Sequence, residues 1–386
     1  MKLLLVAGTR PETIKMAPVL LALARQASVQ AQLCLSGQHG RLAQEPLRFF
    51  GLAADHVLNH RPCGNLADTL ARMTLKLGAV MDRQRPDRVL VHGDTLTAAA
   101  AAQAAYFRRI PVGHVEAGLR TYRRDMPWPE ETIRCLVDDL CDLLFAPTET
   151  ARDHLLAERT GGRVIVTGNT GIDALRVGTE QLEALQSQRR RRARKLILVT
   201  GHRRENIGEP LLRVCAVLRV LARRGDADIV LPVHPNPQVS ALVREQLADF
   251  AGVRLVPPLG YGPFLSLLRR ADLVLSDSGG VQEEAVALGR PLLILRDTTE
   301  RPEALRAAGT TLVGTDPQRL LEAAEEALAI PRMAACRVLP NPFGDGLASE
   351  RIVDTLLGRK VAEFSAPAEH GHAATAVPHA PLLAHG

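Results

Sequence analysis

Short, almost wholly apolar runs alternate along this chain with longer stretches of helical periodicity. Lys2–Ala7 is the first apolar run, and Pro11 then stands at the start of a helical pattern that continues to about Arg25. A strand that is apolar on both faces is typical of a parallel sheet, because helices cover both sides of such a sheet. The sequence therefore predicts an α/β fold built on parallel strands.

The alternation occurs in both halves of the 386-residue chain, so we expect two doubly wound α/β domains of similar size. The expected strands of the first half are Lys2–Ala7, Gln32–Ser36, Arg88–His92, Pro111–Val115, Leu143–Ala146 and Arg163–Thr167. Those of the second half are Lys195–Thr200, Asp228–Val233, Arg254–Val256, Leu273–Ser276 and Leu292–Leu295. We expect the seam near Gln186–Lys195, whose six basic residues we interpret as a solvated helix end and linker rather than a nucleic-acid patch.

Composition argues against several classes of protein. The chain has no uninterrupted run of about 20 apolar residues, so we expect no membrane-spanning helix. Its six cysteines form no C-x-x-C pair, which argues against a zinc site or a disulfide framework and favours a reducing cytoplasm. Aromatic residues make up only 3%, which leaves few stacking platforms for single-stranded nucleic acid. The Ala-, Pro- and His-rich end, Glu363–Gly386, is expected to be a disordered tail.

Polar motifs follow the expected strands at their carboxyl ends, where ligands bind in open parallel sheets. Ser278-Gly279-Gly280 follows a strand and opens a helix, so its backbone N–H groups either bind a phosphate or form a simple turn and cap. Glu284 lies one helical turn further on, where its carboxylate could accept hydrogen bonds from ribose hydroxyls. Neither a G-x-G-x-x-G after the first strand nor a G-x-x-x-x-G-K-[ST] occurs, so we expect neither a bound NAD of the usual kind nor a P-loop.

Charged side chains from both halves are expected at the same strand ends. The basic residues, which can bind a diphosphate, are Arg10, Lys15, His202 and Arg301. The acids, which suit proton transfer if they converge on one cleft, are Asp94, Glu116 and Glu130. Asp94 is also a candidate N-cap for the helical pattern that starts at Thr95. A cleft with cations on one wall and acids on the other fits an enzyme that acts on a nucleotide sugar.

Together these motifs closely resemble those of the bacterial non-hydrolysing UDP-N-acetylglucosamine 2-epimerases. The resemblance covers about Met1 to Gly358 and rests on ordered motifs, namely G-T-R-P-E-T-I-K-M-A-P, V-H-G-D-T, H-V-E-A-G-L-R-T, P-W-P-E-E, G-N-T-G-I-D-A-L, T-G-H-R-R-E-N, D-S-G-G-V-Q-E-E and R-D-T-T-E-R-P-E. It implies two Rossmann-like, doubly wound parallel-sheet domains of glycosyltransferase-B architecture, with the active site in the interdomain cleft. The expected parts are an N-terminal domain with the catalytic acids (1–185), a C-terminal UDP-binding domain (186–340), a segment that crosses back with a helix at about Ser349–Leu357 (341–360), and the tail (361–386).

The resemblance also implies roles for individual residues. The implied UDP contacts are Arg10, Lys15, His202, Leu259, Phe264, Ser278, Gly279, Gly280, Glu284 and Arg301, with Leu259 and Phe264 flanking the uracil. The implied catalytic residues are Asp94, Glu116, Glu130 and His202. It further implies UDP-N-acetylglucosamine and UDP-N-acetylmannosamine as ligands, no metal or redox cofactor, a cytoplasmic homodimer, and no nucleic-acid or membrane partner.

Many bacterial members of this family bind a second substrate molecule as an activator beside the active site. The residues available here for such an allosteric site are Gln38, Arg72, Glu130, Arg203 and His234. The chain departs from the family pattern at Gly40, after Gln38-His39, and at Ile133, within P-W-P-E-E-T-I-R. Both departures concern the second site rather than the core chemistry.

The implied reaction is a reversible epimerisation at sugar carbon 2. Elimination of UDP gives a 2-acetamidoglucal, and re-addition with protonation on the opposite face gives UDP-N-acetylmannosamine for cell-surface polysaccharide synthesis. Two faces require two proton-transfer groups, which accounts for several acids in one cleft. The alternatives are a hydrolysing 2-epimerase, a glycosyltransferase of the same architecture, and a non-catalytic UDP-sugar sensor.

Overall fold

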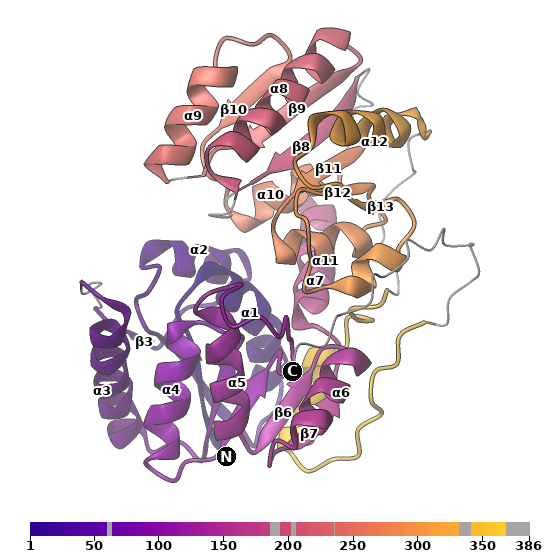
Figure 1. Ribbon diagram of the computed structural model, residues 1–386. Coiled ribbons are helices and arrows are strands. Elements are labelled where there is room, and N and C mark those ends of the chain that lie inside the picture. Colours follow the sequence, from indigo (N-terminus) through magenta and orange to yellow (C-terminus); the bar gives the residue numbers. More distant parts are fainter. Residues whose placement is uncertain (60–63, 186–193, 202–205, 235, 332–340, 368–386) are drawn as a thin grey trace, which may run out of the picture.

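The computed structural model describes residues 1–59, 64–185, 194–201, 206–234, 236–331 and 341–367. Within them the chain forms two separate sheets, one in each half, and helices flank each sheet (Figure 1). All the strand pairings of both sheets are parallel. The predicted fold class, two doubly wound α/β units, is confirmed.

The first sheet precedes residue 170. Its strands are β1 (Lys2–Ala7), β2 (Gln30–Leu35), β3 (His56–Val57), β4 (Arg88–His92), β5 (Val112–Val115), β6 (Leu143–Ala146) and β7 (Arg163–Val166). Its helices are α1 (Arg10–Ala24), α2 (Arg41–Phe49), α3 (Leu66–Gln84), α4 (Leu96–Tyr106), α5 (Glu130–Leu140) and α6 (Glu149–Glu158), and α7 (Thr170–Leu185) follows them. The seven strands lie in the order β3-β2-β1-β4-β5-β6-β7.

The second sheet begins after the expected seam. Its strands are β8 (Lys195–Thr200), β9 (Ala227–Pro232), β10 (Val253–Val256), β11 (Leu273–Ser276), β12 (Leu292–Ile294) and β13 (Thr310–Leu312). Its helices are α8 (Glu209–Arg224), α9 (Pro237–Leu247), α10 (Tyr261–Leu268), α11 (Gly279–Ala287), the 3-10 turn η2 (Pro302–Arg306) and α12 (Pro317–Ala329), and α13 (Ala348–Leu356) ends the fold. The six strands lie in the order β10-β9-β8-β11-β12-β13.

The predicted strands are all present within two residues of their expected bounds, but β3 and β13 were not predicted. β3 is two residues long and β13 three, so neither carries enough periodicity to stand out from a loop. Both lie at the edge of a sheet, where the neighbouring strand supplies the pairing. Most of the expected seam, residues 186–193, lies outside the described residues.

The central strands are buried on both faces, as their sequences predict. In β4, Val89 and Val91 pack into one apolar layer with the alanines of α4, while Leu90 packs into the opposite layer with Leu3 and Leu5 of β1. The first helix, α1, has a complete capping box, because Thr9 accepts from the Glu12 backbone N–H and the Glu12 carboxylate accepts from the Thr9 N–H. This box fixes the helix start directly after β1.

Two helices connect the halves. α7 packs against α1 of the first half and against α10 and α11 of the second (Figure 1). α13 returns to pack on α1 and α7, and Asp173 of α7 accepts hydrogen bonds from the backbone N–H groups of Ala348 and Ser349 at the start of α13. The numbered domain boundaries remain a prediction. None of the described helices is long and apolar enough to cross a membrane.

Candidate active site between the two sheets

Each sheet has a switch point, where the strand order runs outward in opposite directions from two adjacent central strands. These strands are β1 and β4 in the first sheet and β8 and β11 in the second. Ligands of doubly wound sheets bind in the crevice at the carboxyl ends of such strands. The predicted site motifs follow these four strands, with Arg10 after β1, Asp94 after β4, Gly201 after β8 and Ser278 after β11.

The N-terminus of α11 forms one side of the site. Ser278 is the N-cap residue, and within the described chain its side chain makes no capping hydrogen bond. The helix end therefore keeps backbone N–H donors and a partial positive charge, which together favour an anion. A Cβ atom at Gly279 would lie only 2.5 Å from Nη1 of Arg301. Glycine at this position therefore lets a guanidinium approach the helix end.

Arg301 is buried at this helix end and is held by two carboxylates. Its Nε donates to Oε1 of Glu283 at 2.5 Å, and its Nη1 donates to Oε1 of Glu300 at 3.0 Å. Burial lowers the pKa of the Arg301 guanidinium, but Glu283 and Glu300 outweigh burial and raise the pKa above its ordinary value. Arg301 is therefore a fixed positive charge beside Gly279.

Lys15 links the site residues of the two sheets. It is buried in α1, and its Nζ forms ion pairs with Glu116, which follows β5, and with Oε2 of Glu283 on α11 at 3.1 Å. Burial lowers the pKa of Lys15, but the two carboxylates raise it above its ordinary value. Lys15, Glu116, Glu283 and Arg301 form one continuous group of charges between the sheets, which we call the central cluster.

Glu116 has an unusual backbone conformation within the central cluster. Its φ is +68°, in the left-handed region that non-glycine residues rarely adopt and that often marks a functional site. Its Oε2 accepts from Nδ2 of Asn169 at 3.1 Å and lies 3.8 Å from Nε2 of His92. Burial alone would raise the pKa of Glu116, but Lys15, together with His92 and Arg301, outweighs burial and holds the pKa below its ordinary value.

His92 is a buried neutral imidazole beside this carboxylate. Burial lowers the pKa of His92 to about 4, although the charge of Glu116 works in the opposite direction. Neither ring nitrogen has a hydrogen-bond partner among the residues that the structure describes. A buried polar group without a partner is costly, so its presence next to Glu116 is a functional signal rather than a packing one.

Asp94 is not a helix cap, so that alternative is wrong. Thr95 is the N-cap of α4, and its Oγ1 accepts from the Ala98 backbone N–H at 3.2 Å. The Asp94 carboxylate instead forms an ion pair with Arg134 of α5. Threonine takes the cap because it stands one residue nearer the helix, which leaves the Asp94 carboxylate available to Arg134.

Arg134 also connects Asp94 to the start of α5. Nη1 of Arg134 is 3.1 Å from Oε2 of Glu131, whose Oε1 accepts from two backbone N–H groups of the preceding loop. Glu130 is the first residue of α5, is partly exposed, and shares the Arg134 face because the two are four residues apart. The structure therefore brings the segments that carry Asp94 and Glu130 together.

A second contact between the halves lies at α10. Glu45 of α2 accepts from the Tyr261 backbone N–H through both carboxylate oxygens, each at 3.0 Å. Arg10, at the start of α1, has its Nε 3.9 Å from the same Glu45 carboxylate. Glu284 of α11 lies near Tyr261, and burial raises the pKa of Glu284 to about 7. This carboxyl is therefore easily neutralised, in contrast to Glu116.

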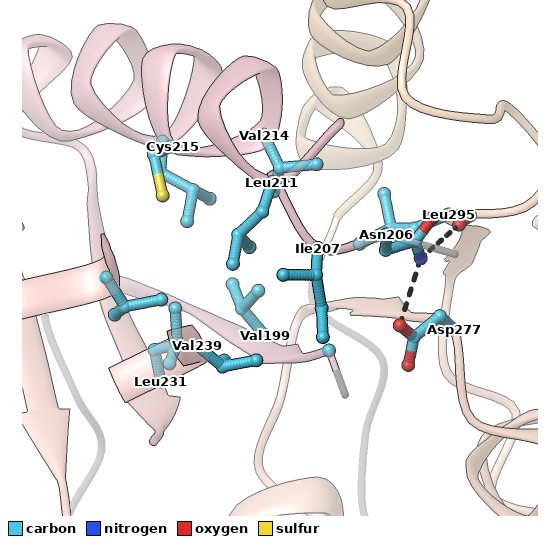
Figure 2. Close-up of a pocket in the computed structure, with 13 residues that line it drawn as sticks. Val199, Asn206, Ile207, Leu211, Val214, Cys215, Leu231, Val239, Asp277 and Leu295 are labelled. Atoms are coloured by element: carbon cyan, nitrogen blue, oxygen red, sulfur yellow. Dashed lines mark hydrogen bonds between the residues drawn. The ribbon is translucent and has the colours of Figure 1, made fainter. Parts of the chain in front are cut away.

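His202 and Arg203 lie outside the described residues, but the residues on either side of them are placed. Asn206 donates from Nδ2 to Oδ2 of Asp277 at 2.9 Å and to the Leu295 carbonyl at 3.0 Å, as Figure 2 shows. Gly201 is also next to Asp277, since a Cβ at Gly201 would lie 3.8 Å from the same oxygen. The cavity drawn in Figure 2 measures about 30 Å³, room for a water molecule and not for a nucleotide.

The family to which the chain belongs follows from its sequence and fold together. A family model described as UDP-N-acetylglucosamine 2-epimerase matches residues 21–357. The chain belongs to the UDP-N-acetylglucosamine 2-epimerase family. The UDP-N-acetylglucosamine 2-epimerase of Escherichia coli (strain K12) is 43% identical over 374 residues, which cover 94% of this chain and 100% of the relative.

Two solved structures of epimerases have the same fold. The UDP-GlcNAc 2-epimerase from Neisseria meningitidis, crystallised bound to UDP-GlcNAc, is 42% identical with a TM-score of 0.87, and the match covers 93% of this chain and 100% of that one. The UDP-GlcNAc 2-epimerase from Methanocaldococcus jannaschii, in complex with UDP-GlcNAc and UDP, is 34% identical with a TM-score of 0.80 and the same coverage. The two-sheet architecture expected for the epimerase family is therefore confirmed.

The remaining epimerase residues that the sequence singled out are spread over several elements. Leu259 lies just before α10, and Phe264 lies in the first turn of that helix, half-buried. Among the allosteric candidates, Gln38 accepts from the Thr97 hydroxyl at 2.8 Å, Arg72 is exposed on α3, and His234 follows β9. In the described part of the chain, no hydrogen bond or ion pair joins Gln38, Arg72 and Glu130 to one another. The second site therefore stays a prediction.

Four residues that contact the predicted site residues were not singled out from the sequence. They are His92, Arg134, Asn169 and Glu283. Each lies in or directly after a motif quoted above, so the motif was available as a sequence signal for the residue. The motif alone does not say which of its polar side chains contacts the other site residues. In the described residues no group of three or more His, Cys, Asp or Glu side chains is arranged to hold a metal ion.

Proposed function

We propose that this protein is a non-hydrolysing UDP-N-acetylglucosamine 2-epimerase that interconverts UDP-N-acetylglucosamine and UDP-N-acetylmannosamine. The observation that carries the proposal is the central cluster, in which Lys15 of the first sheet contacts both Glu116 and Glu283. A carboxylate, two cations and the N-terminus of α11 thereby lie next to one another. That combination suits a reaction that releases a diphosphate and moves a proton in the same place.

UDP binds, in this proposal, to the face formed by α11 and its neighbours. The backbone N–H groups after Ser278 and the guanidinium of Arg301 hold the diphosphate, with Lys15 and Arg10 adding positive charge from the first sheet. The other proposed UDP contacts are His202, Leu259, Phe264, Gly279, Gly280 and Glu284. Contacts from both halves keep UDP bound while the sugar is detached, which a reversible re-addition requires.

The chemistry proceeds by elimination and re-addition. Breaking the bond between carbon 1 and the β-phosphate gives oxocarbenium character at carbon 1, which acidifies the proton on carbon 2. One carboxylate removes that proton to give the 2-acetamidoglucal, and a second group delivers a proton to the opposite face as UDP adds again. Asp94, Glu116 and Glu130 supply these groups, and His202, Arg10 and the helix terminus stabilise the charge that develops on the phosphate.

Three further features belong to the proposal. UDP-N-acetylglucosamine acts as an activator at a second site that includes Gln38, Arg72, Glu130, Arg203 and His234. The protein works as a homodimer in the cytoplasm. Light scattering of the pure protein measures its mass in solution and so distinguishes a dimer from a monomer. No metal or redox cofactor takes part, so chelators leave turnover unchanged.

The decisive experiment follows UDP-N-acetylglucosamine by NMR in heavy water with the pure protein. An epimerase produces UDP-N-acetylmannosamine, and deuterium enters carbon 2 of both sugars. Release of free N-acetylmannosamine with UDP would assign the protein to the hydrolysing branch instead. UDP release only when a sugar acceptor is added would indicate a glycosyltransferase. The experiment is repeated from UDP-N-acetylmannosamine alone, so that an initial lag removed by traces of UDP-N-acetylglucosamine reveals activation.

A further inference from the structure

A fully buried histidine lies in β5, the strand that immediately precedes Glu116. His114 is in β5, two residues before Glu116, and is 0% exposed. Its Nδ1 lies 2.6 Å from Oδ1 of Asp138, and its Nε2 lies 2.9 Å from the carbonyl oxygen of Gly93. Both distances are those of hydrogen bonds, so each ring nitrogen has one partner.

The two partners determine the protonation of the ring. A backbone carbonyl only accepts, so Nε2 carries a proton and donates it to Gly93. The Asp138 carboxylate faces two further donors, since its Oδ2 lies 2.7 Å from Nη2 of Arg120 and 3.3 Å from the Gly118 backbone N–H. An ionised carboxylate also only accepts, so Nδ1 carries a proton as well. We therefore expect both ring nitrogens of His114 to carry a proton, so that an imidazolium faces Asp138 in the core of the protein.

The positive and negative charges around this pair balance. Arg120, which is 6% exposed, donates to both oxygens of Glu158 through Nε at 2.8 Å and Nη2 at 2.6 Å. His114 and Arg120 thus face Asp138 and Glu158, two cations against two anions. The group is neutral as a whole, which allows it to lie where an isolated charge would be costly.

The pair joins the three segments that carry the proposed catalytic acids. Gly93 immediately precedes Asp94, and Gly118 follows Glu116 by two residues. Asp138 lies on α5, the helix that begins with Glu130. The His114 ring and the Asp138 carboxylate therefore connect the end of β4, the turn after β5 and α5 to one another.

We propose that His114 and Asp138 are positioning residues that hold the three carboxylates of the epimerase site at fixed positions relative to one another. This inference rests on the proposed function. A buried ion pair adds little stability compared with apolar side chains of similar size, so stability alone does not account for it. Directional hydrogen bonds to three segments do account for it. Proton transfer to the two faces of one sugar carbon tolerates little displacement of the acids, and apolar packing would fix them less closely.

The charge state is tested on the wild-type protein, without any substitution. Histidine-labelled protein is examined by nitrogen NMR at neutral pH, and the His114 ring is identified by the signal lost in His114→Gln. Two protonated ring nitrogens are expected. A single protonated nitrogen at His114 would overturn the charged pair, whether or not the protein is an epimerase.

The positioning role is tested by two variants that each keep one of the two bonds. The amide nitrogen of His114→Gln can replace Nε2 and keep the bond to Gly93, whereas that of His114→Asn can replace Nδ1 and keep the bond to Asp138. Each is expected to lower kcat about 10- to 100-fold, because small displacements of catalytic groups have effects of this size. KM and the Kd of UDP stay unchanged, since neither bond touches the proposed UDP face. The matched control is His56→Gln on β3, at the far edge of the same sheet, which keeps full turnover.

The outcomes separate the two proposals. A wild-type protein without epimerase turnover would refute the proposed function alone. An active wild type together with variants of normal kcat would refute the positioning role. Variants in which kcat, UDP affinity and the melting temperature all fall while KM rises would also refute it, because that pattern belongs to general loss of structure. Asp138→Asn provides a second route to the same kcat-specific loss if His114 variants fold poorly.

Discussion

Replacing Gly279 by alanine tests whether the helix end of α11 and Arg301 form one site. The added Cβ would lie 2.5 Å from Nη1 and 2.7 Å from Cζ of Arg301, closer than any real Cβ contact. The guanidinium has little freedom to retreat, because Glu283 holds its Nε at 2.5 Å and Glu300 holds its Nη1 at 3.0 Å. Either the helix end or Arg301 must move.

The size of the effect follows from these contacts. Weakening a hydrogen bond between charged groups costs about 1.5–3 kcal/mol, and overpacking of a buried site costs a similar 1–3 kcal/mol. Alanine in place of glycine in a helix gives back up to about 1 kcal/mol. The two costs are alternatives, because a guanidinium that retreats relieves the overpacking, so the net loss is about 1–2 kcal/mol in the free energy of unfolding. If Arg301 is displaced instead, the same free energy lowers the affinity for UDP about 5- to 30-fold, at 1.4 kcal/mol for each factor of ten.

Gly280→Ala is the matched variant one residue along. A Cβ at Gly280 has no atom within 4 Å among the described residues, so this substitution stabilises the free protein by about 0.5–1 kcal/mol. It nevertheless fills space at the helix end that the diphosphate occupies under the proposed function. We therefore expect a more stable protein that binds UDP more weakly.

Urea unfolding and calorimetric titration with UDP measure both quantities for the two variants. The reasoning about Arg301 fails if Gly279→Ala has the stability and the UDP affinity of the wild type. The placement of the diphosphate at the helix end fails if Gly280→Ala binds UDP normally.

Three other predictions concern the charged groups of the site. Asp94→Asn is expected to lower epimerase turnover by at least about 100-fold while UDP still binds. The heavy-water assay measures the turnover and calorimetry measures UDP binding. Near-normal turnover would remove Asp94 from the catalytic set. Lys15→Met leaves Glu116 buried without its paired lysine, while Glu283 keeps only Arg301, so the free energy of unfolding in urea should fall by about 3–5 kcal/mol. An unchanged urea midpoint would contradict the central cluster. The pKa of Glu284 is raised from 4.5 to about 7 in the folded protein. Between these two pH values the folded carboxyl keeps a proton that the unfolded chain has lost, so the free energy of unfolding of the wild type should fall as the pH rises from about 4.5 to about 7. Glu284→Gln should lack this component of the fall, and parallel stability curves for the two proteins would count against the raised pKa.

The fold and the position of the site could be predicted because both depend on local patterns. Apolar runs such as Leu3–Val6 identify strands that are buried on both faces, and parallel topology then places the residues after each strand at one edge. The ends of β1, β4, β5, β8 and β11 are therefore predictable site positions. Short edge strands were not predictable, because their pairing comes from a neighbour rather than from their own sequence.

The partners of each charged residue could not be predicted, because they depend on contacts between distant segments. Glu283 and Glu284 are adjacent in one motif, yet Glu283 pairs with Lys15 and Arg301 while Glu284 lies near Tyr261. Successive residues of a helix point about 100° apart, so only the docking of α11 against α1 decides which carboxylate meets the lysine. Sequence reasoning chose Glu284 and missed Glu283 for this reason.

The central cluster also bears on when Glu116 can act as a base under the proposed function. In the structure Lys15 holds the pKa of Glu116 below its ordinary value, and a carboxylate whose pKa is lowered is a weaker base. A diphosphate bound at α11 would bring negative charge close to Lys15 and Arg301, the cations that stabilise the ionised carboxylates. Sharing those cations with the phosphate raises the pKa of Glu116 towards the working pH. The nucleotide thus helps to prepare the base that acts on its own sugar, so proton abstraction depends on a bound diphosphate.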